Sequence, residues 1–515
     1  MTFQPADPRT SLNAARRRHD LDAVADDAVD LLVVGLGITG VGVALDAASR
    51  GLSVLAVDAH DLAFGTSRWS SKLVHGGLRY LAQGDVGLAW ASARERDALM
   101  RHIAPHLVSP LPMIFPAHSD VSHVQSAAIG SALVAGEALR AAARTGRAYL
   151  PRPRRLTATE ALRLAPGLRR DGLRHAWLGW DGQLSDDARL VVAVARTAAG
   201  LGARIVTRCR AVGLHGRGAE LRDELTGETF SVRAGMVVNA TGVWAGQLAP
   251  DIALRPSRGS HLVFRSEAFP GGLGAAITTP VPGSSSRFVF ALPQPDGRVY
   301  VGLTDEPADG PIPDVPTPSD AEVDMLLSTM SAALATPLTR DDVVGSFAGL
   351  RPLLAHGPDP TIGGGARSRA GNRADLSRRH VVHASADGVV TVVGGKLTTY
   401  RRMAADAVDL AAATRAVPVP PSGTARLPLV GAASPRRLAS LPVSRSMVWR
   451  YGTEAAEVQA LDPDPLAAQL IWGARHEGAL DIDDLLDRRT RVGLVGSDRD
   501  AATAAARDAL AGAAV

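Results

Sequence analysis

The stretch DLLVVGLGITG, residues 30–40, decides the fold. Its apolar run from Leu31 to Val34 predicts a buried strand, and the GxGxxG turn that follows opens a helix over about Ile38 to Arg50. A second strand is expected from Ser53 to Val57. A strand, a glycine turn, a helix and a second strand in this order predict a parallel βαβ unit that binds a dinucleotide at the helix N-terminus.

The residues of the turn have separate tasks toward such a ligand. Gly35 allows the tight turn, Gly37 lets the backbone approach a pyrophosphate, and Gly40 lets the helix pack closely on the strand. Ile38 and Thr39 open the helix and are expected beside the same phosphates. A purely structural glycine turn is the alternative, and the full strand, helix and strand context disfavours it.

Two further segments bear on which dinucleotide binds. Asp58 ends the second strand, where a carboxylate accepts hydrogen bonds from ribose hydroxyls and repels the 2′-phosphate of NADP. A later apolar strand, Met236 to Val238, runs into Ala240, Thr241 and Gly242, which resemble the ATG segment of two-domain FAD proteins. We therefore expect FAD rather than NAD, with this second segment at the cofactor.

Composition excludes several classes of protein. A chain of 515 residues that is 46% hydrophobic can bury a large core and is expected to form about two to four domains. A net charge of only +4 and 4% aromatic residues do not predict a nucleic-acid partner. The single cysteine, Cys209, forms no internal disulfide and no metal-ligand spacing, so we expect a cytoplasmic protein without a metal site.

Lysine is rare in this chain. Of 56 lysine and arginine residues, only Lys72 and Lys396 are lysine. The two lysines can mark positions where a guanidinium cannot replace an ammonium group. The alternative is that they remain by chance.

The chain divides into three regions. Residues 1–29 are expected to be a polar, mobile tail, residues 30–420 interleaved cofactor and substrate-cap domains, and residues 421–515 a helical domain. Proline-rich connections are expected over 105–116, a helix over 126–144, an exposed loop over 361–379 and a helix over 397–413. Further strands are expected at Ala203–Thr207, Gly235–Asn239, His261–Phe264, Arg287–Leu292, Val299–Leu303, Val343–Phe347 and Val389–Val393.

Neither an export signal nor a membrane span is expected. Five aspartates between Asp20 and Asp30 follow Arg16, Arg17 and Arg18, where an export signal needs an apolar run. The most apolar segment, residues 121–136, is interrupted by polar residues and is too short to span a bilayer. Contact with a membrane surface stays open.

The segment GTSRWSSKLVHGGLRY, residues 65–80, is rich in hydroxyls and cations. Such groups and exposed backbone N–H groups suit phosphate and flavin oxygens, and Arg79 can fork to a phosphate beside Tyr80. His75 is either a structural or a catalytic histidine. The expected cofactor contacts here are Thr66, Ser67, Ser70, Ser71, Lys72, Leu73, Gly76 and Gly77.

Lys396 lies in VGGKLTTYR, residues 393–401, at the expected N-terminus of a helix. A cation opposes the helix dipole there, so an anion is expected to join it. Gly395, Leu397 and Thr398 are expected at the cofactor, and Thr398 also at the anion. Arg351, in FAGLRPL (347–353), and His261, which is expected to start a strand after a glycine turn, are further candidates.

At these motifs the chain resembles the FAD-dependent glycerol-3-phosphate dehydrogenases of the aerobic, respiratory type. The dinucleotide fingerprint, SSKLVHGGLRYL (70–81), AGLRPL (348–353) and GGKLTTYR (394–401) carry the resemblance. Four further segments look like the same family: DGQLSDDARL (181–190), RGSHLVF (258–264), VGLTD (301–305) and LLDRRTR (485–491).

The resemblance implies an α/β fold: a Rossmann-like FAD-binding domain of the DAO type, an antiparallel substrate-cap sheet and a C-terminal helical domain. It implies oxidation of sn-glycerol 3-phosphate to dihydroxyacetone phosphate, with electrons passed to a quinone at the inner face of the plasma membrane. Arg79, Arg351 and Lys396 would bind the substrate phosphate, with Tyr80 and Thr398 nearby. His75 and His261 would lie near the substrate carbinol.

The chemistry of the residues agrees with this implication. A hydride passes from C2 to flavin N5 while a base takes the hydroxyl proton, and a neutral histidine suits that task. His261 is the first candidate for the base and His75 the second, with Arg351 also placed at the catalytic centre.

Alternative functions remain at this point. They are an FAD-dependent oxidoreductase of hydroxy acids or amino acids, a glycerol-3-phosphate oxidase that uses O2, and a flavin- or NAD-binding module without catalysis. Three cations suit a phosphate better than a carboxylate, and no large insertion of the oxidase kind is evident. The sequence leaves open the natural electron acceptor and whether the chain forms a homodimer.

Overall fold

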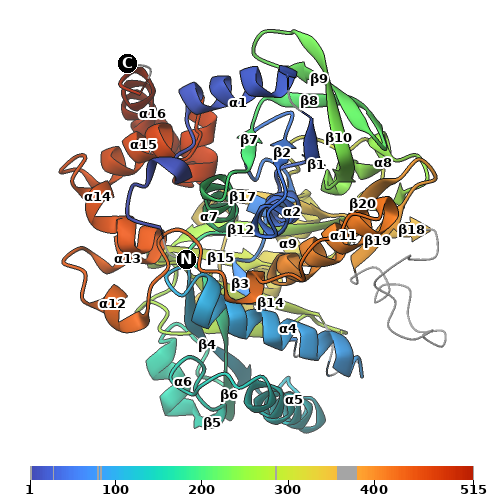
Figure 1. Ribbon diagram of the computed structural model, residues 1–515. Helices are drawn as coiled ribbons and strands as arrows, with labels where there is room; N and C mark the ends of the chain where they lie inside the picture. The colour runs from blue at the N-terminus through green and yellow to red at the C-terminus, as the bar shows by residue number, and fades with distance from the viewer. Residues whose placement is uncertain are drawn as a thin grey trace.

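The computed structural model describes residues 3–26, 28–77, 81, 84–284, 287–356 and 380–513. Two large sheets and a helical C-terminal region form the molecule, as Figure 1 shows. Arg79, Tyr80 and the expected loop over 361–379 lie outside the described residues.

The first sheet has the strand order β19-β20-β10-β1-β2-β7. Its central strand β1 pairs in parallel with β2 and β10, and α2 (Ile38–Ser49) connects β1 to β2, so the predicted βαβ opening is confirmed. The strands are β1 (Val29–Val34), β2 (Val54–Val57), β7 (Arg204–Val206), β10 (Thr229–Asn239), β19 (His380–Ala384) and β20 (Val389–Gly394), with β8 (Cys209–His215) and β9 (Gly218–Asp223) extending from β10.

The glycine turn after β1 tolerates no side chain at two positions. Gly35 has φ +104°, and a Cβ there would lie 2.6 Å from the carbonyl oxygen of Ala240. A Cβ on Gly40 would lie 1.7 Å from the carbonyl oxygen of Gly35. The turn therefore packs directly against the segment that follows β10, and only glycine permits that contact.

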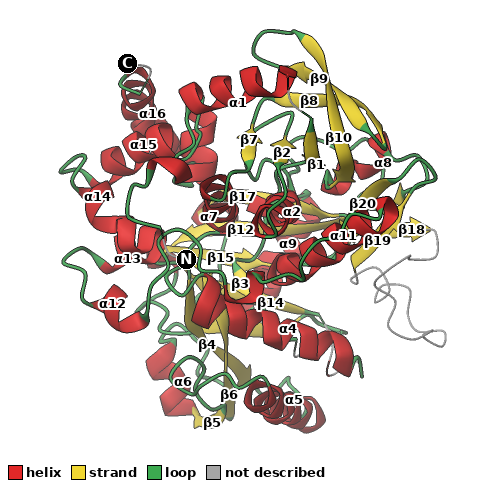
Figure 2. Cartoon of the chain, in the orientation of Figure 1, coloured by secondary structure: helices red, strands yellow, loops and turns green. Residues whose placement is uncertain are grey.

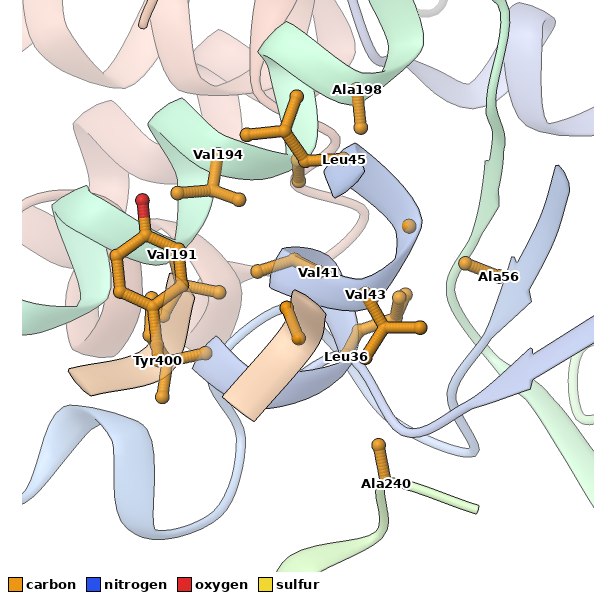
Figure 3. Packing of buried hydrophobic residues seen from close by; sticks show 14 of the residues in the cluster. Leu36, Val41, Val43, Leu45, Ala56, Val191, Val194, Ala198, Ala240 and Tyr400 are labelled. Carbon is orange, nitrogen blue, oxygen red and sulfur yellow. The ribbon is translucent and has the colours of Figure 1, made fainter. Parts of the chain in front are cut away.

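Helix α2 is buried between two other helices. Figure 3 shows Val41 and Leu45 of α2 near Val191 and Val194 of α7 (Asp187–Gly200), with Tyr400 of α11 (Tyr400–Arg415) close by. All of these side chains are at most 2% exposed. This packing fixes the helix whose N-terminus faces the dinucleotide site.

The second sheet has the order β16-β12-β15-β14-β13-β4-β6-β3, with β17 on β12 and β5 on β6. Its pairs are antiparallel except β13 with β4, which agrees with the expected antiparallel cap sheet. The strands are β3 (Leu73–Val74), β4 (Val108–Ala117), β5 (Arg154–Thr157), β6 (His175–Leu184), β12 (Ser257–Arg265), β13 (Ala276–Pro280), β14 (Phe288–Pro293), β15 (Arg298–Gly302), β16 (Glu306–Pro307) and β17 (Val343–Arg351).

Strand β4 corrects the prediction of proline-rich connections over 105–116. It pairs with β6 along its whole length. Pro110, Pro112 and Pro116 are separated by even numbers of residues, so their backbone nitrogens face the same edge of the strand. Proline removes the N–H donors on that edge only, and the donors on the opposite edge remain. Three prolines are therefore compatible with a long strand.

The expectation of a mobile N-terminal tail was wrong. Residues 14–26 form α1 (Ala14–Asp26), preceded by a short 3-10 turn, Pro8–Thr10. Arg17 donates to the carbonyl oxygen of Thr207 at 2.7 Å and pairs with Asp223, and Arg196 of α7 donates to the carbonyl oxygen of Thr10 at 3.1 Å. Polar residues here bind distant backbone instead of facing solvent.

The other helices cover the sheets and build the C-terminal region. Helix α5 agrees with the helix expected over 126–144, and the named elements after residue 420 are all helical, as predicted (Figure 2). No helix among the described residues is long and apolar enough to cross a membrane. The helices are α4 (Val86–Ala98), α5 (His123–Ala142), α6 (Ala158–Leu164), α8 (Ala245–Leu248), α9 (Asp320–Ser331), α12 (Pro435–Ala439), α13 (Arg445–Tyr451), α14 (Ala455–Gln459), α15 (Pro465–His476), the π-helical segment η10 (Asp484–Arg489) and α16 (Gly496–Ala511).

Candidate functional site

A cavity of about 1500 Å³ is lined by residues of both sheets. The glycine turn after β1 and the segment after β10 line it from the first sheet. Strands β12, β13, β14 and β17 line it from the second, and α5 also contributes to its wall. Most of the residues expected at the cofactor or the substrate lie on this wall.

The dinucleotide end of the cavity brings together eight of the predicted cofactor residues, Asp58 and seven others. Asp58 accepts hydrogen bonds from the backbone N–H groups of Leu36 and His60, at 2.7 and 2.8 Å. Burial raises the pKa of Asp58, and these two donors oppose that rise. The other predicted residues on the wall here are Gly35, Gly37, Ile38, Thr39, Ala240, Thr241 and Gly242.

This end fits a dinucleotide. The close contacts at Gly35 and Gly40 hold the first turn of α2 against the glycine turn. At Gly37, in contrast, a Cβ would meet only the hydroxyl of Ser67, at 3.1 Å. The N-terminus of a helix supplies N–H groups and a partial positive charge to a pyrophosphate. The backbone is therefore open where phosphates would bind and closed where the helix packs.

The segment after β2 adds hydroxyls to the wall. Ser67 accepts a hydrogen bond from the N–H of Ile38 at 2.8 Å, and Thr66 donates to the carbonyl oxygen of Leu350 at 2.6 Å. The predicted residues of this segment that line the cavity are Thr66, Ser67, Ser70, Ser71, Leu73 and Gly77.

Lys72, Gly76 and Gly40 were also expected at the cofactor, and the structure does not place them on the wall. The ammonium group of Lys72, whose residue is 1% exposed, donates to Asp187 at 3.0 Å. Burial lowers the pKa of Lys72 to about 8, with Asp187 opposing the fall. Lys72 thus supports the segment from behind.

Gly76 is confined by a buried guanidinium. A Cβ on Gly76 would lie 1.9 Å from Nη1 of Arg96, and its N–H donates to Asp181 at 3.0 Å. Its role is to let Arg96 approach the backbone beside His75.

The wall of the cavity also includes Lys396, Arg351 and Thr398, together with Gly395 and Leu397. Lys396 caps the short 3-10 turn Leu397–Thr399, which leads into α11, as the expected helix start requires. Arg351 ends β17 and donates to Asp305 at 2.9 Å and to the carbonyl oxygen of Thr304 at 3.0 Å. Two of the three cations expected at the substrate phosphate thus line one cavity.

His75 lines the cavity and has a buried partner. Its side chain is 45% exposed, and its Nδ1 lies 3.7 Å from Oδ2 of Asp181. Arg96 donates to the other oxygen of Asp181 at 2.6 Å. Burial opposes ionisation of Asp181, but the Arg96 guanidinium and His75 outweigh it, so the pKa of Asp181 is lowered.

His261 is not on the wall of the cavity. It lies inside β12, not at the start of a strand as expected, because β12 begins at Ser257. The residue is 0% exposed, its ring stacks on Phe347 with centroids 4.6 Å apart, and its Nε2 lies 2.9 Å from the hydroxyl of Ser71. Burial, with the charges of Lys72 and Arg351, holds the pKa of His261 well below its ordinary value.

The sequence did not predict the residues that support these side chains. Glu95 and Arg96 are consecutive on α4, and Glu95 accepts from Arg401 at 2.8 Å, next to the Lys396 segment. Arg96 and Asp181 are separated by 85 positions. The conspicuous carboxylates of DGQLSDDARL were the only sequence signal for Asp181.

The sequence also missed an apolar end of the cavity. Met113 and Phe115 of β4, Phe290 of β14, and Ile129 and Leu133 of α5 line it. These residues come from elements that show no motif, so only the fold brings them to the site.

Comparison with known proteins agrees with this geometry. The family model "FAD dependent oxidoreductase" matches residues 30–401. Glycerol-3-phosphate dehydrogenase 1 of Mycobacterium tuberculosis is 51% identical over 97% of this chain and 98% of that protein. Glycerol-3-phosphate dehydrogenase 2 of the same species is 35% identical over 95% and 85%.

A solved structure has the same architecture. The X-ray structure of the glycerol-3-phosphate dehydrogenase from Bacillus halodurans, complexed with FAD, superposes with a TM-score of 0.74 at 26% identity, covering 98% of this chain and 94% of that chain. L-α-glycerophosphate oxidase from Mycoplasma pneumoniae shares the fold, with a TM-score of 0.56. The chain is therefore an FAD-dependent oxidoreductase and belongs to the glycerol-3-phosphate dehydrogenase family.

Proposed function

We propose that this protein oxidises sn-glycerol 3-phosphate to dihydroxyacetone phosphate and passes the electrons to a quinone. The observation that carries the proposal is the cavity itself, whose wall combines a dinucleotide cradle, His75 with its buried carboxylate, and the cations Lys396 and Arg351. In this proposal the cradle binds the cofactor, His75 accepts a proton, and the two cations bind an anion.

The proposed binding site for the substrate phosphate contains Lys396 and Arg351. Lys396 is a compact charge at a helix start, and Arg351 is held in place by Asp305 and the Thr304 carbonyl. A phosphate carries more charge than a carboxylate and recruits both cations, with Thr398 beside them. Binding a group remote from the reacting carbon fixes the orientation of that carbon.

His75 is the base that takes the hydroxyl proton. Asp181 faces Nδ1 at 3.7 Å, which favours a proton on that nitrogen and leaves Nε2 to accept. Bound FAD supplies the acceptor for the hydride from C2, N5 of its isoalloxazine ring. His261 instead holds Ser71, because its ring is buried away from the cavity and its Nε2 already contacts that hydroxyl.

The apolar end suits a quinone as electron acceptor. Apolar and aromatic side chains line it, and α5 carries this wall to the surface, where Val124 is 80% and Val134 is 66% exposed. Two arginines follow α5, Arg147 and Arg152, whose side chains are 56% and 65% exposed and which share one carboxylate, Glu137, at 3.9 and 4.0 Å. An apolar helix face beside cations suits the surface of an anionic membrane, from which a quinone would enter.

The test is anaerobic reduction of the purified yellow holoprotein. Glycerol 3-phosphate should bleach the flavin absorbance near-stoichiometrically, and a quinone analogue added afterwards should restore it. A flavin that a hydroxy acid or amino acid bleaches faster would point to the rival oxidoreductases. Faster reoxidation by O2 than by the quinone analogue would favour an oxidase.

A further inference from the structure

Lys72 and Arg491 meet behind the segment that lines the cofactor cavity. The carbonyl oxygen of Arg68 accepts a hydrogen bond from Nζ of Lys72 at 3.0 Å and from Nη2 of Arg491 at 2.8 Å. Lys72 belongs to the segment itself, whereas Arg491 follows η10 in the C-terminal helical region. Two cations from distant parts of the chain therefore share one backbone acceptor.

Two carboxylates at the start of α7 balance these cations. Asp187 accepts from Lys72 at 3.0 Å and from the N–H of Ser70 at 2.8 Å, and Asp186 lies 3.8 Å from Nε of Arg491. All four charged residues are at most 2% exposed. We call Lys72, Asp186, Asp187 and Arg491 the buried charge cluster. A buried charge is tolerated only where it is paired, so each member depends on the others.

Both cations of the buried charge cluster have a left-handed backbone. The φ angle is +57° at Lys72 and +65° at Arg491. Residues with a Cβ rarely adopt this conformation, and it persists where the surrounding contacts enforce it. At Arg491 these contacts include its carbonyl oxygen, which accepts from Arg298 at 2.8 Å, and its Nη1, which donates to the carbonyl oxygen of Asp487 at 3.0 Å.

The other side of the same segment faces the cavity. Trp69, Ser70 and Ser71 line it, and Lys72 follows directly. The guanidinium carbon atoms of Arg68 and Arg491 lie 4.3 and 5.0 Å from the Trp69 ring centroid. The backbone between residues 68 and 72 thus has the cavity on one side and the buried charge cluster on the other.

We propose that Arg491 is a positioning residue for the FAD site, and that the C-terminal helical region acts through it to hold residues 68–72 in the shape that binds the cofactor. This inference rests on the proposed placement of FAD against Trp69, Ser70 and Ser71. The inference assigns a function to the segment LLDRRTR, residues 485–491, because Arg491 is its last residue. Arg491 does not line the cavity, so its effect passes through the Arg68 carbonyl and the Trp69 ring.

The test compares Arg491→Met with a matched variant, Arg499→Met. Arg499 belongs to the same C-terminal region and pairs with Asp483 and Asp487. It donates no hydrogen bond to the described residues 68–72, and it reaches them only through Asp487, which lies 4.0 Å from Arg68. FAD is removed from each purified holoprotein and its rebinding is followed by quenching of flavin fluorescence. Loss of a charged hydrogen bond corresponds to a weakening of about tenfold or more, so the Kd for FAD should rise by that factor in Arg491→Met alone.

The absorption spectrum of the bound flavin gives a second readout that general destabilisation does not move. It should shift in Arg491→Met and stay unchanged in Arg499→Met. Arg491→Lys keeps the charge but has a single nitrogen in place of the fork, so it should restore part of the FAD affinity. Lys72→Met should weaken FAD binding as well. The double variant should lose less FAD-binding free energy than the two single variants together, because both side chains act on the carbonyl oxygen of Arg68.

The inference is overturned if Arg491→Met binds FAD with wild-type affinity and spectrum. If that variant does not fold, Arg491→Lys decides in the same way, since unchanged affinity and spectrum there would also overturn it. Equal losses in Arg491→Met and Arg499→Met would assign the effect to general stability. A wild-type protein that binds FAD but is not reduced by glycerol 3-phosphate would contradict the proposed substrate and leave this test valid.

Discussion

Nδ1 of His75 lies 3.7 Å from Oδ2 of Asp181, a carboxylate whose other oxygen accepts from Arg96 at 2.6 Å. The pKa of Asp181 is lowered, so this carboxyl group favours folding above its unfolded pKa, and that contribution is lost only as the pH falls through the lower folded value. Asp181 therefore stays ionised throughout the neutral range, and a negative charge faces the ring wherever the enzyme works.

Asp181→Asn should lower kcat, because the ring of His75 loses the carboxylate that faces its Nδ1 and favours a proton on that nitrogen. The KM for glycerol 3-phosphate should change little. Asp97→Asn, one residue after Arg96 and paired with Arg101, is the control and should keep the wild-type kcat. An unchanged kcat in Asp181→Asn would show that Asp181 does not assist the base.

His75→Gln and His261→Gln should differ sharply in steady-state kinetics. Loss of a general base lowers kcat by about 10²- to 10⁴-fold, and we expect that loss for His75→Gln. His261→Gln removes a buried contact with Ser71, so it should lower thermal stability and FAD affinity while retaining the pH profile. The reverse pattern would return the role of base to His261.

Lys396→Met should lower kcat/KM for glycerol 3-phosphate by about 10- to 100-fold, the range for a lost charged hydrogen bond. Glycerol offers no phosphate to Lys396, so its slow oxidation should be the same in wild type and variant. An equal loss with both substrates would mean that Lys396 does not bind the phosphate. Lys396→Arg should recover part of the loss, since the charge returns on a larger group.

Gly40→Ala should abolish FAD binding or prevent folding. The added Cβ would lie 1.7 Å from the carbonyl oxygen of Gly35, so α2 must move away from the turn. Gly213→Ala is the matched control, because a Cβ there meets nothing within 4 Å and the φ angle is ordinary. Flavin content after purification measures both, and a yellow, stable Gly40→Ala protein would contradict the packing.

A charged substitution on α5 should weaken membrane contact without touching the chemistry. Val134→Glu, at a residue that does not line the cavity, places a negative charge on the exposed apolar face, which should reduce co-sedimentation with anionic vesicles. Turnover with a membrane quinone should fall in parallel, whereas turnover with a soluble dye should stay near the wild-type rate. Equal vesicle binding by wild type and variant would place the membrane contact elsewhere.

The sequence predicted the features that depend on local pattern. The glycine turn, its flanking strands and Asp58 follow from residues that are close in the chain, and all of them lie where expected. Lys396 at a helix start is equally local. Such features are readable because backbone geometry and hydrogen bonding within a short segment determine them.

Features that depend on distant pairing were not predicted. His261 looked like a strand start because the local GxH pattern does not reveal that β15 and β17 flank it and bury its ring. The N-terminal segment looked like a tail because its ordering contact joins Arg17 to Asp223, 206 positions away. Strand β4 was not predicted because its prolines lack N–H donors. Whether those donors are needed depends on the neighbouring strands, which the local sequence does not reveal.

The strand order of the first sheet determines when the cofactor site can be completed. The cradle is encoded by residues 35–40, yet β10 ends at Asn239 and β20 at Gly394, so the ribosome has made most of the chain before the sheet can close around it. Pairings of such long sequence separation make folding slow. Until β10 is made, the parallel edge of β1 stays open to other strands, so newly made chains should depend on chaperones to avoid aggregation.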